Sequence, residues 1–219
     1  NGKFIKTFTV DFTPRAIFYQ RDLLYIFNAK FLENEGSSVF VRIIDAVSLK
    51  SLKDIRITDK NIKLNKYEGD TQISQRLFRY DINEKGNIYF LDIAECTLFE
   101  IDENGKLIKK TRLPHQFNMK TNYAKQGTNI SITLAMDDLY LGLKPVKNSV
   151  FFNYQKTISK NVENGNTIQT YILKLNSDGK ISQKNFDGDL VILGHHLNYL
   201  YLFDFSDYQV TPVKLSEWD

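Results

Sequence analysis

One short pattern recurs four times along the 219-residue chain. It is an alternating apolar run that carries a tyrosine, and its copies are LLYIFN (23–28), NIYFLD (87–92), DLYLGL (138–143) and YLYLFD (199–204). Each run is short, rich in aromatic and aliphatic residues and bounded by polar residues, which is typical of a β-strand. Copies separated by far more than one strand predict a repeated unit of several strands.

Further strand candidates surround these copies. Those that precede them are RAIFYQ (15–20), RLFRYDI (76–82), ISITLAM (130–136) and DLVILGH (189–195). Those that follow include TLFEIDENGKLIKK (97–110), YILKLNSDGKISQK (171–184) and, more loosely, VRIIDAVSLKSLKD (41–54). Asn104-Gly105 and Asp178-Gly179 supply the positive φ that a tight hairpin turn needs. The sequence therefore predicts four antiparallel strands repeated four times.

Four-stranded units repeated without a helical period predict an all-β fold, a β-propeller. The repeat at 76–113, with GNIYFLD followed by LFEIDENGKLIK, resembles NHL-type propeller repeats, and the other three repeats match in outline. We expect a single domain over 1–219 with four blades, or part of a six-bladed ring. A sandwich of two sheets is the alternative architecture. The resemblance implies a secreted or cell-envelope protein.

The first residues, NGKFIKTFTV (1–10), look like a turn followed by an outer strand. We expect this N-terminal strand to complete the last blade, because closing the ring in this way removes open sheet edges, which promote aggregation. Composition agrees with a globular protein, since hydrophobic residues make up 42% and charged residues 25% of the chain. No apolar run approaches the ~20 residues that span a bilayer, so we expect no transmembrane segment.

Connection lengths predict which end of the blades binds a partner. The turns within hairpins are expected to be tight, at QRD (20–22), NEKG (83–86), MDD (136–138), DENG (102–105) and NSDG (176–179). The remaining connections are predicted to be long, at 29–38, 58–74, 114–130 and 143–167. Long insertions on a compact domain are often functional, and these should emerge from one end. That end is the predicted binding face.

The long connections carry an excess of lysine, whereas the tight turns lean acidic. The predicted binding residues on them are Lys120, Tyr123, Lys125, Lys144, Lys147, Tyr154, Lys156 and Lys160. Arg76 and Arg79, on a predicted inner strand, could hold a carboxylate or phosphate at the mouth of the channel. Such a face attracts anionic partners, a protein or another anionic macromolecule. The alternative is that these lysines only keep the loops soluble. The net charge of +3 does not favour nucleic acid, and the oligomeric state stays open.

No catalytic set, cofactor motif or metal site stands out. The adjacent His195 and His196 would point to opposite faces of a strand, so both can hardly bind one ion. Asp81 and Asp189 are the only carboxylates on the predicted inner strands, which is too few for a hard cation that takes about six oxygen ligands. The sequence thus predicts a non-enzymatic recognition or scaffold module. The alternative is a propeller hydrolase or lyase that uses the axial channel.

Overall fold

The computed structural model describes residues 7–12, 14–32, 36–58, 78–93, 95–115, 118–126, 129–161 and 165–218. This part of the chain contains sixteen β-strands and one 3₁₀ turn, so the all-β prediction is confirmed. The contacts divide the chain into two compact units, each described by itself below. Unit 1 is 1–75 with 101–106, and unit 2 is 76–100 with 107–219. One domain over the whole chain stays a prediction.

The strands form four antiparallel sheets, in each of which neighbours in sequence are neighbours in space. Unit 1 holds β1 (Ala16–Gln20), β2 (Leu23–Leu32), β3 (Gly36–Asp45) and β4 (Ser51–Thr58). The next sheet is β5 (Phe78–Ile82), β6 (Ile88–Asp92), β7 (Thr97–Ile101) and β8 (Leu107–Arg112). The third is β9 (Asn118–Gln126), β10 (Asn129–Val146), β11 (Ser149–Asn161), β12 (Gly165–Asn176) and β13 (Ile181–Asp187). The last is β14 (Leu190–His196), β15 (Tyr199–Asp204) and β16 (Val210–Lys214), followed by the 3₁₀ turn Leu215–Trp218. Four successive sheets are what the repeat predicts.

In unit 1, apolar side chains of the central strands form the core. Phe27, Val41 and Ile55, from β2, β3 and β4, are fully or almost fully buried. Arg42 on β3 forms ion pairs with Asp54 on β4 (2.8 Å) and with Asp11 (2.5 Å). The sheet is therefore held by apolar burial at its centre and by a charge network at its surface.

In unit 2, the first half of β11, in the middle of the third sheet, is buried on both faces, and the alternation of its side chains shows how. Val150, Phe152 and Tyr154 belong to a hydrophobic cluster shared with β6 and β7. Phe151, between them in sequence, belongs to a second cluster shared with β14 and β15. Because successive side chains of a strand point to opposite faces, one strand supplies both cores. This explains why the apolar residues Val150, Phe151 and Phe152 follow one another without alternation.

The same sheet is bonded to the start of β14 through buried polar groups. Nδ2 of Asn153 donates to the carbonyl of Leu190 (3.1 Å), and its Oδ1 accepts from the N–H of Ile192 (3.4 Å). Gln155 donates to the carboxylate of Asp189 and to the Leu190 carbonyl. Buried polar groups are expensive unless paired, so these bonds fix how β14 joins the sheet. Asp189 is therefore engaged in structure.

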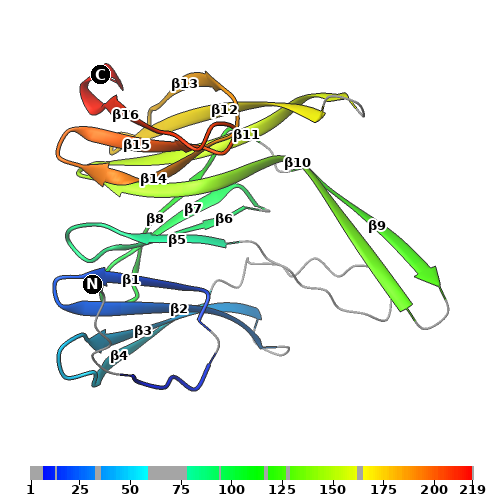
Figure 1. The fold of residues 1–219 in the computed structure, drawn as a ribbon. Coiled ribbons are helices and arrows are strands. Elements are labelled where there is room, and N and C mark those ends of the chain that lie inside the picture. The colour runs from blue at the N-terminus through cyan, green and yellow to red at the C-terminus, as the bar shows by residue number, and fades with distance from the viewer. Residues whose placement is uncertain are drawn as a thin grey trace. The chain divides into compact units, whose positions relative to one another are not determined.

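The third sheet corrects the predicted order of strands. Residues 130–136 and 138–143 were expected as two strands joined by a tight turn at 136–138, but β10 runs through both. A register shift between Met136 and Asp138 takes the place of the turn. The first half of β10 pairs with β9 and the second half with β11, and Figure 1 shows the β9–β10 hairpin extending away from the sheet. The sequence DLYLGL (138–143) therefore belongs to the same strand as ISITLAM, and the strand that follows it is β11.

The predicted long loops are largely strands. Residues 118–126 form β9, and 149–161 and 165–176 form the paired strands β11 and β12. Residues 29–32 and 36–38 extend β2 and β3. The connection 58–74 lies outside the described residues beyond Thr58. The tips of the β9–β10 and β11–β12 hairpins both lie at the end of the sheet opposite the β10–β11 turn, which follows from the pairing. Alternating apolar and polar residues in these segments already favoured strands.

The last sheet has three strands in the described part of the chain, one fewer than predicted. The N-terminal strand expected to complete it begins in residues 1–6, outside the described residues, and residues 7–10 form no strand. In unit 2, β10 contacts both β5 and β14, and we call these three the inner strands. Successive antiparallel sheets that meet at their inner strands are the organisation of the β-propeller class.

Candidate binding site

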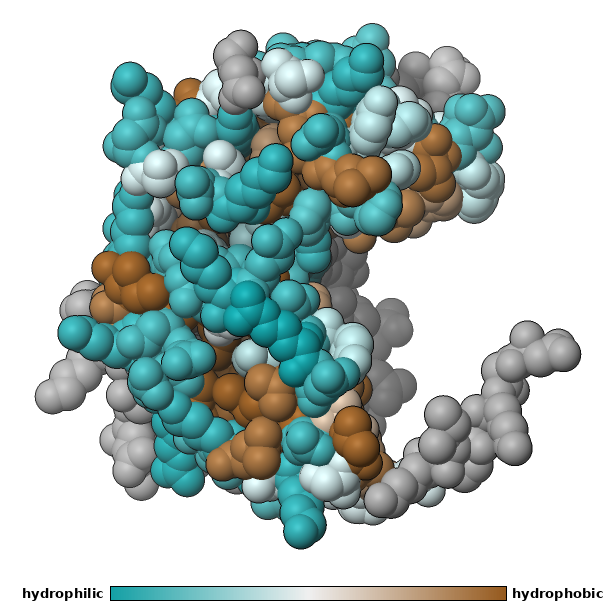
Figure 2. Space-filling view, turned by 90° about the vertical axis from the view of Figure 1, so that its left-hand side faces the viewer, coloured by the Kyte–Doolittle hydropathy of each residue, from teal (hydrophilic) through white to brown (hydrophobic). Residues whose placement is uncertain are grey.

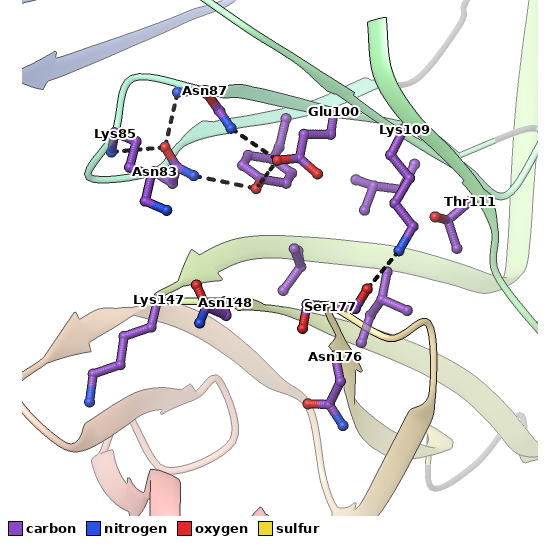
Figure 3. A pocket seen from close by; sticks show the side chains of 14 residues that line it. Asn83, Lys85, Asn87, Glu100, Lys109, Thr111, Lys147, Asn148, Asn176 and Ser177 are labelled. Atoms are coloured by element: carbon purple, nitrogen blue, oxygen red, sulfur yellow. Dashed lines mark hydrogen bonds between the residues drawn. The ribbon is translucent and has the colours of Figure 1, made fainter.

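Unit 2 contains a pocket of about 170 Å³ between the sheet β5–β8 and the sheet β9–β13. Its rim is formed by three tight turns, the β5–β6 turn at 83–87, the β10–β11 turn at 147–148 and the β12–β13 turn at 177–180. Figure 3 shows the side chains of the two sheets facing one another across it. The pocket therefore opens at the end of the sheets opposite the predicted binding face.

The β5–β6 turn is shaped by one asparagine. Oδ1 of Asn83 accepts hydrogen bonds from the backbone N–H groups of Lys85 (3.0 Å) and Asn87 (2.9 Å). Asparagine stabilises turns in this way, and Gly86 supplies the positive φ. Its amide Nδ2 lies 3.4 Å from the hydroxyl of Tyr89, so the turn is tied to the pocket wall. The motif NEKGN is thus a local cause of the rim's shape.

The carboxylate of Glu100, on β7, lies in the wall of the pocket. Its Oε1 accepts hydrogen bonds from the hydroxyl of Tyr89 (2.7 Å) and from Nδ2 of Asn87 (3.0 Å). Burial, and then the bond to Glu100, raise the pKa of Tyr89, so this hydroxyl keeps its proton and remains a donor. Oε2 of Glu100 has no hydrogen-bond partner among the described residues. One oxygen of this carboxylate is therefore held in place and the other is left to accept.

Three lysines line the same pocket. Lys109 on β8 reaches across the pocket, where its Nζ donates to the carbonyl of Ser177 (3.1 Å), as Figure 3 shows. Lys85 and Lys147 are exposed on two of the turns, and in the described part of the chain neither ammonium has a partner. In Figure 3, Lys147 extends outward at the rim. Three positive charges against one carboxylate make the local balance positive. The site can therefore attract anions.

The remaining lining is partly apolar and partly amide. Leu98, Val150 and Leu175 belong to the cluster that packs the two sheets together. Asn148 and Asn176 stand on the turns of the opposite sheet. Figure 2 looks at the side on which the β5–β6 and β14–β15 turns emerge in Figure 1, and hydrophilic side chains dominate it. A polar pocket within a polar surface suits a hydrated ligand better than an apolar one.

A second group of charged side chains lies on the inner strands of unit 2. Nζ of Lys144 on β10 lies 2.8 Å from Oδ2 of the buried Asp81 on β5. Nε2 of His195 on β14 lies 3.9 Å from Oε1 of Glu84, and its Nδ1 is buried without a hydrogen-bond partner among the described residues. Burial raises the pKa of Asp81 despite its ion pair, and burial and then Lys144 lower the pKa of His195. The charges of Lys144 and Asp81 thus both act on the pKa of His195, in opposite directions.

The predicted binding residues do not form one site. Lys120, Tyr123 and Lys125 lie on β9 and Lys160 on β11, in the long hairpins, whereas Lys147 lines the pocket at the other end. Lys156 is exposed on β11, and Lys144 is paired with Asp81.

Two further residues of that set correct the prediction. Tyr154 is 4% exposed and stacks on His115 with ring centroids 4.3 Å apart, so it is a core residue and offers no ring to a partner. Arg79 is partly buried and donates to the carbonyl of Leu141 (2.6 Å). Arg76 lies outside the described residues.

Sequence reasoning missed Lys85, Lys109, Glu100 and the amides of the pocket. The signal was present, because the turns NEKGN and KNS are rich in lysine and asparagine. The lengths of the connections, however, favoured the end of the sheets opposite these turns. The prediction that tight turns are acidic fails in part, since Asp137 and Asp138 lie within β10.

No protein-family model and no curated protein matches the chain. Among solved structures, a selenomethionine-substituted virginiamycin B lyase from Staphylococcus aureus aligns with 92% of this chain and 94% of its own, at 12% identity and a TM-score of 0.24. We infer no activity from this likeness. No helix among the described residues is long and apolar enough to cross a membrane. Within the same residues, no three metal-ligating side chains gather.

Proposed function

We propose that this chain is a recognition module that binds anionic groups of a macromolecule, and that the pocket of unit 2 carries the binding. The supporting observation is a pair of ammonium groups, Lys85 and Lys147, that have no partner in the described part of the chain and stand on two turns that rim one pocket. An ammonium already paired with a buried carboxylate, as in Lys144, has little charge left for a partner. The paired and unpaired lysines therefore distinguish structural from binding charge.

The pocket is proposed as the binding site because three lysines gather around one cavity. Lys85, Lys109 and Lys147 come from three separate turns and strands and line one cavity. Convergent donors on a rigid frame bind with less loss of side-chain freedom than scattered ones.

Charge reversal tests the proposal. Fluorescein-labelled poly-L-glutamate is titrated at low salt against the parent chain, Lys85→Glu/Lys147→Glu and Lys120→Glu/Lys125→Glu. The pocket variant should lose at least about tenfold in affinity, and the hairpin variant should bind as the parent does. Lys50→Glu/Lys214→Glu, at two exposed positions away from the pocket, makes the same change of net charge and is the control for it. Loss only in the hairpin variant would place binding at the originally predicted face and overturn the proposal.

Salt dependence separates a nucleic-acid binder from this reading. Neutralising many phosphates gives a steep fall of affinity with added salt. We expect a single-stranded DNA probe to bind no more tightly than poly-L-glutamate of equal charge. A DNA affinity that is higher and falls steeply with salt would identify a nucleic-acid protein instead. The NHL-type resemblance and the secreted or cell-envelope location stay predictions.

A second candidate function is acid–base chemistry at the inner strands, the hydrolase or lyase alternative. The observation that favours it is His195, whose buried Nδ1 lacks a hydrogen-bond partner among the described residues and whose pKa is lowered by burial and then by Lys144. A mostly neutral imidazole at neutral pH can act as a general base. Turnover of a lactone panel by the parent chain, lost in His195→Gln and kept in His196→Gln, would establish it. Absence of turnover leaves the binding module.

A further inference from the structure

We infer that the pocket ligand is a sugar acid, a single hydroxylated ring that carries a carboxylate. This rests on the proposed function and specifies the ligand of the same site. A purely anionic ligand would not require Glu100, because a carboxylate in the wall repels it. The wall nevertheless holds Glu100 in place through Tyr89 and Asn87 (2.7 and 3.0 Å). The ligand must therefore offer hydrogen-bond donors as well as negative charge.

The two carboxylate oxygens of Glu100 indicate where a hydrogen-bond donor of the ligand would bind. Both protein donors bond to Oε1, which leaves Oε2 as an unused acceptor in the described structure. An ionised carboxylate only accepts hydrogen bonds, and a hydroxyl group can supply one. Bonds between neutral hydroxyls and an ionised group are stronger than neutral pairs. Glu100 is thus suited to a ligand hydroxyl.

The amide groups on the opposite turns add the complementary chemistry. Oδ1 of Asn176 accepts a hydrogen bond from the hydroxyl of Ser149 (3.2 Å), which fixes this amide at the edge of the pocket. Asn148 has no side-chain partner among the described residues and offers both an acceptor and donors. Alternating donors and acceptors around a small pocket match a ring whose hydroxyls do both.

The apolar lining argues against a simple inorganic anion. Leu98, Val150 and Leu175 present hydrocarbon to the cavity, and phosphate or sulfate has no apolar surface to place on it. The C–H groups of a sugar ring provide such an apolar surface. The cavity of about 170 Å³ is smaller than the roughly 300–1,000 Å³ of pockets for drug-sized ligands. It therefore suits one ring, with the positive charges of Lys85 and Lys147 at the rim to attract its carboxylate.

Calorimetric titration of the full chain tests this with three probes at equal ionic strength. D-Glucuronate carries charge and hydroxyls, D-glucose hydroxyls alone and acetate charge alone. We expect one glucuronate per chain, bound at least about tenfold more tightly than either of the others, because each supplies only part of the interactions. Equal or tighter binding of acetate or glucose than of glucuronate would overturn the assignment.

Two variants place the ligand. Glu100→Gln keeps an oxygen for Tyr89 and Asn87 but loses the charge that holds the hydroxyl, and it should weaken glucuronate by about tenfold. Asn148→Ala, on an exposed turn, should weaken glucuronate while preserving the fold, which urea unfolding verifies. Lys214→Ala is the matched control. Unchanged glucuronate affinity in both pocket variants would place the ligand elsewhere.

The outcomes also separate this inference from the proposed function. If poly-L-glutamate binds and requires Lys85 and Lys147 while glucuronate does not bind, the sugar-acid assignment fails and the recognition module stands. If neither probe binds, both fail.

Discussion

The ammonium of Lys144 on β10 lies 2.8 Å from Oδ2 of Asp81 on β5, and this ion pair joins two sheets at their inner strands. The side chain of Asp81 is 4% exposed and that of Lys144 is 24% exposed, so the carboxylate is the buried partner. Its other oxygen accepts from the backbone N–H of Ile82 (2.8 Å). Lys144 therefore compensates a buried negative charge in unit 2.

Lys144→Met should therefore destabilise the chain by about 3 kcal/mol at pH 7, because it leaves a buried carboxylate without its partner. Urea unfolding measures the loss. Burial already raises the pKa of Asp81, so the deficit should shrink toward pH 4, where the carboxyl gains a proton. The double variant Asp81→Leu/Lys144→Met should lie within about 1 kcal/mol of the parent. Parent-like stability of Lys144→Met at pH 7 would contradict this account.

Gly142 lies against Asn153 so closely that a Cβ added there would overlap its Oδ1. Gly142→Ala should displace that amide and break its bonds to Leu190 and Ile192, at a cost of about 1–3 kcal/mol. Gly194→Ala is the matched control, since Gly194 also lies on an inner strand and a Cβ there meets nothing within 4 Å. Thermal unfolding compares the two. Equal melting temperatures would show that the amide is not essential.

Gly105 and Gly179 occupy equivalent hairpin turns with φ of +85° and +89°. Alanine at either position is strained by the positive φ, at about 1 kcal/mol. At Gly105 a Cβ would also lie 2.7 Å from Cγ2 of Ile55, whereas at Gly179 it meets nothing within 4 Å. We expect Gly105→Ala to be the more destabilising of the two in urea unfolding. The reverse order would mean that Ile55 moves aside freely.

The lowered pKa of His195 predicts how the free energy of unfolding depends on pH. Its pKa in the folded chain is lowered by burial and then by Lys144, below the ordinary value of 6.5. The unfolded chain therefore takes up this proton first, and the stability that His195 contributes is present above pH 6.5 and lost as the pH falls below it. His195→Gln should flatten the decline of unfolding free energy between about pH 7 and pH 5. His196→Gln controls for the loss of an imidazole, and an unchanged slope in His195→Gln would refute the assignment.

Asp81 acts in the opposite direction over a lower range. Because its folded pKa is raised above 3.8, its contribution is present below pH 3.8 and is lost as the pH rises through the folded pKa. The His195 measurement is therefore made as a difference between parent and variant above pH 5.

The sequence by itself determined the class and much of the local structure. Alternating apolar runs around Tyr25, Tyr89 and Tyr201 became strands, and the turns at Gly105 and Gly179 adopt the positive φ that their residues predicted. These features depend on neighbours in the chain, through strand alternation and turn chemistry, so they can be read locally. The count of four sheets followed from the same repeat.

Only the tertiary structure decided that residues 129–146 form the single strand β10. It also decided which lysines remain available to bind a partner. ISITLAM and DLYLGL merge because each half of β10 finds a different partner, β9 or β11. Lys144 meets a carboxylate 63 residues away and Lys109 a carbonyl 68 residues away, whereas Lys85 and Lys147 meet no described group. Such pairings arise from the packing of sheets distant in sequence, where burial makes an unpaired charge costly. No local pattern of residues encodes them.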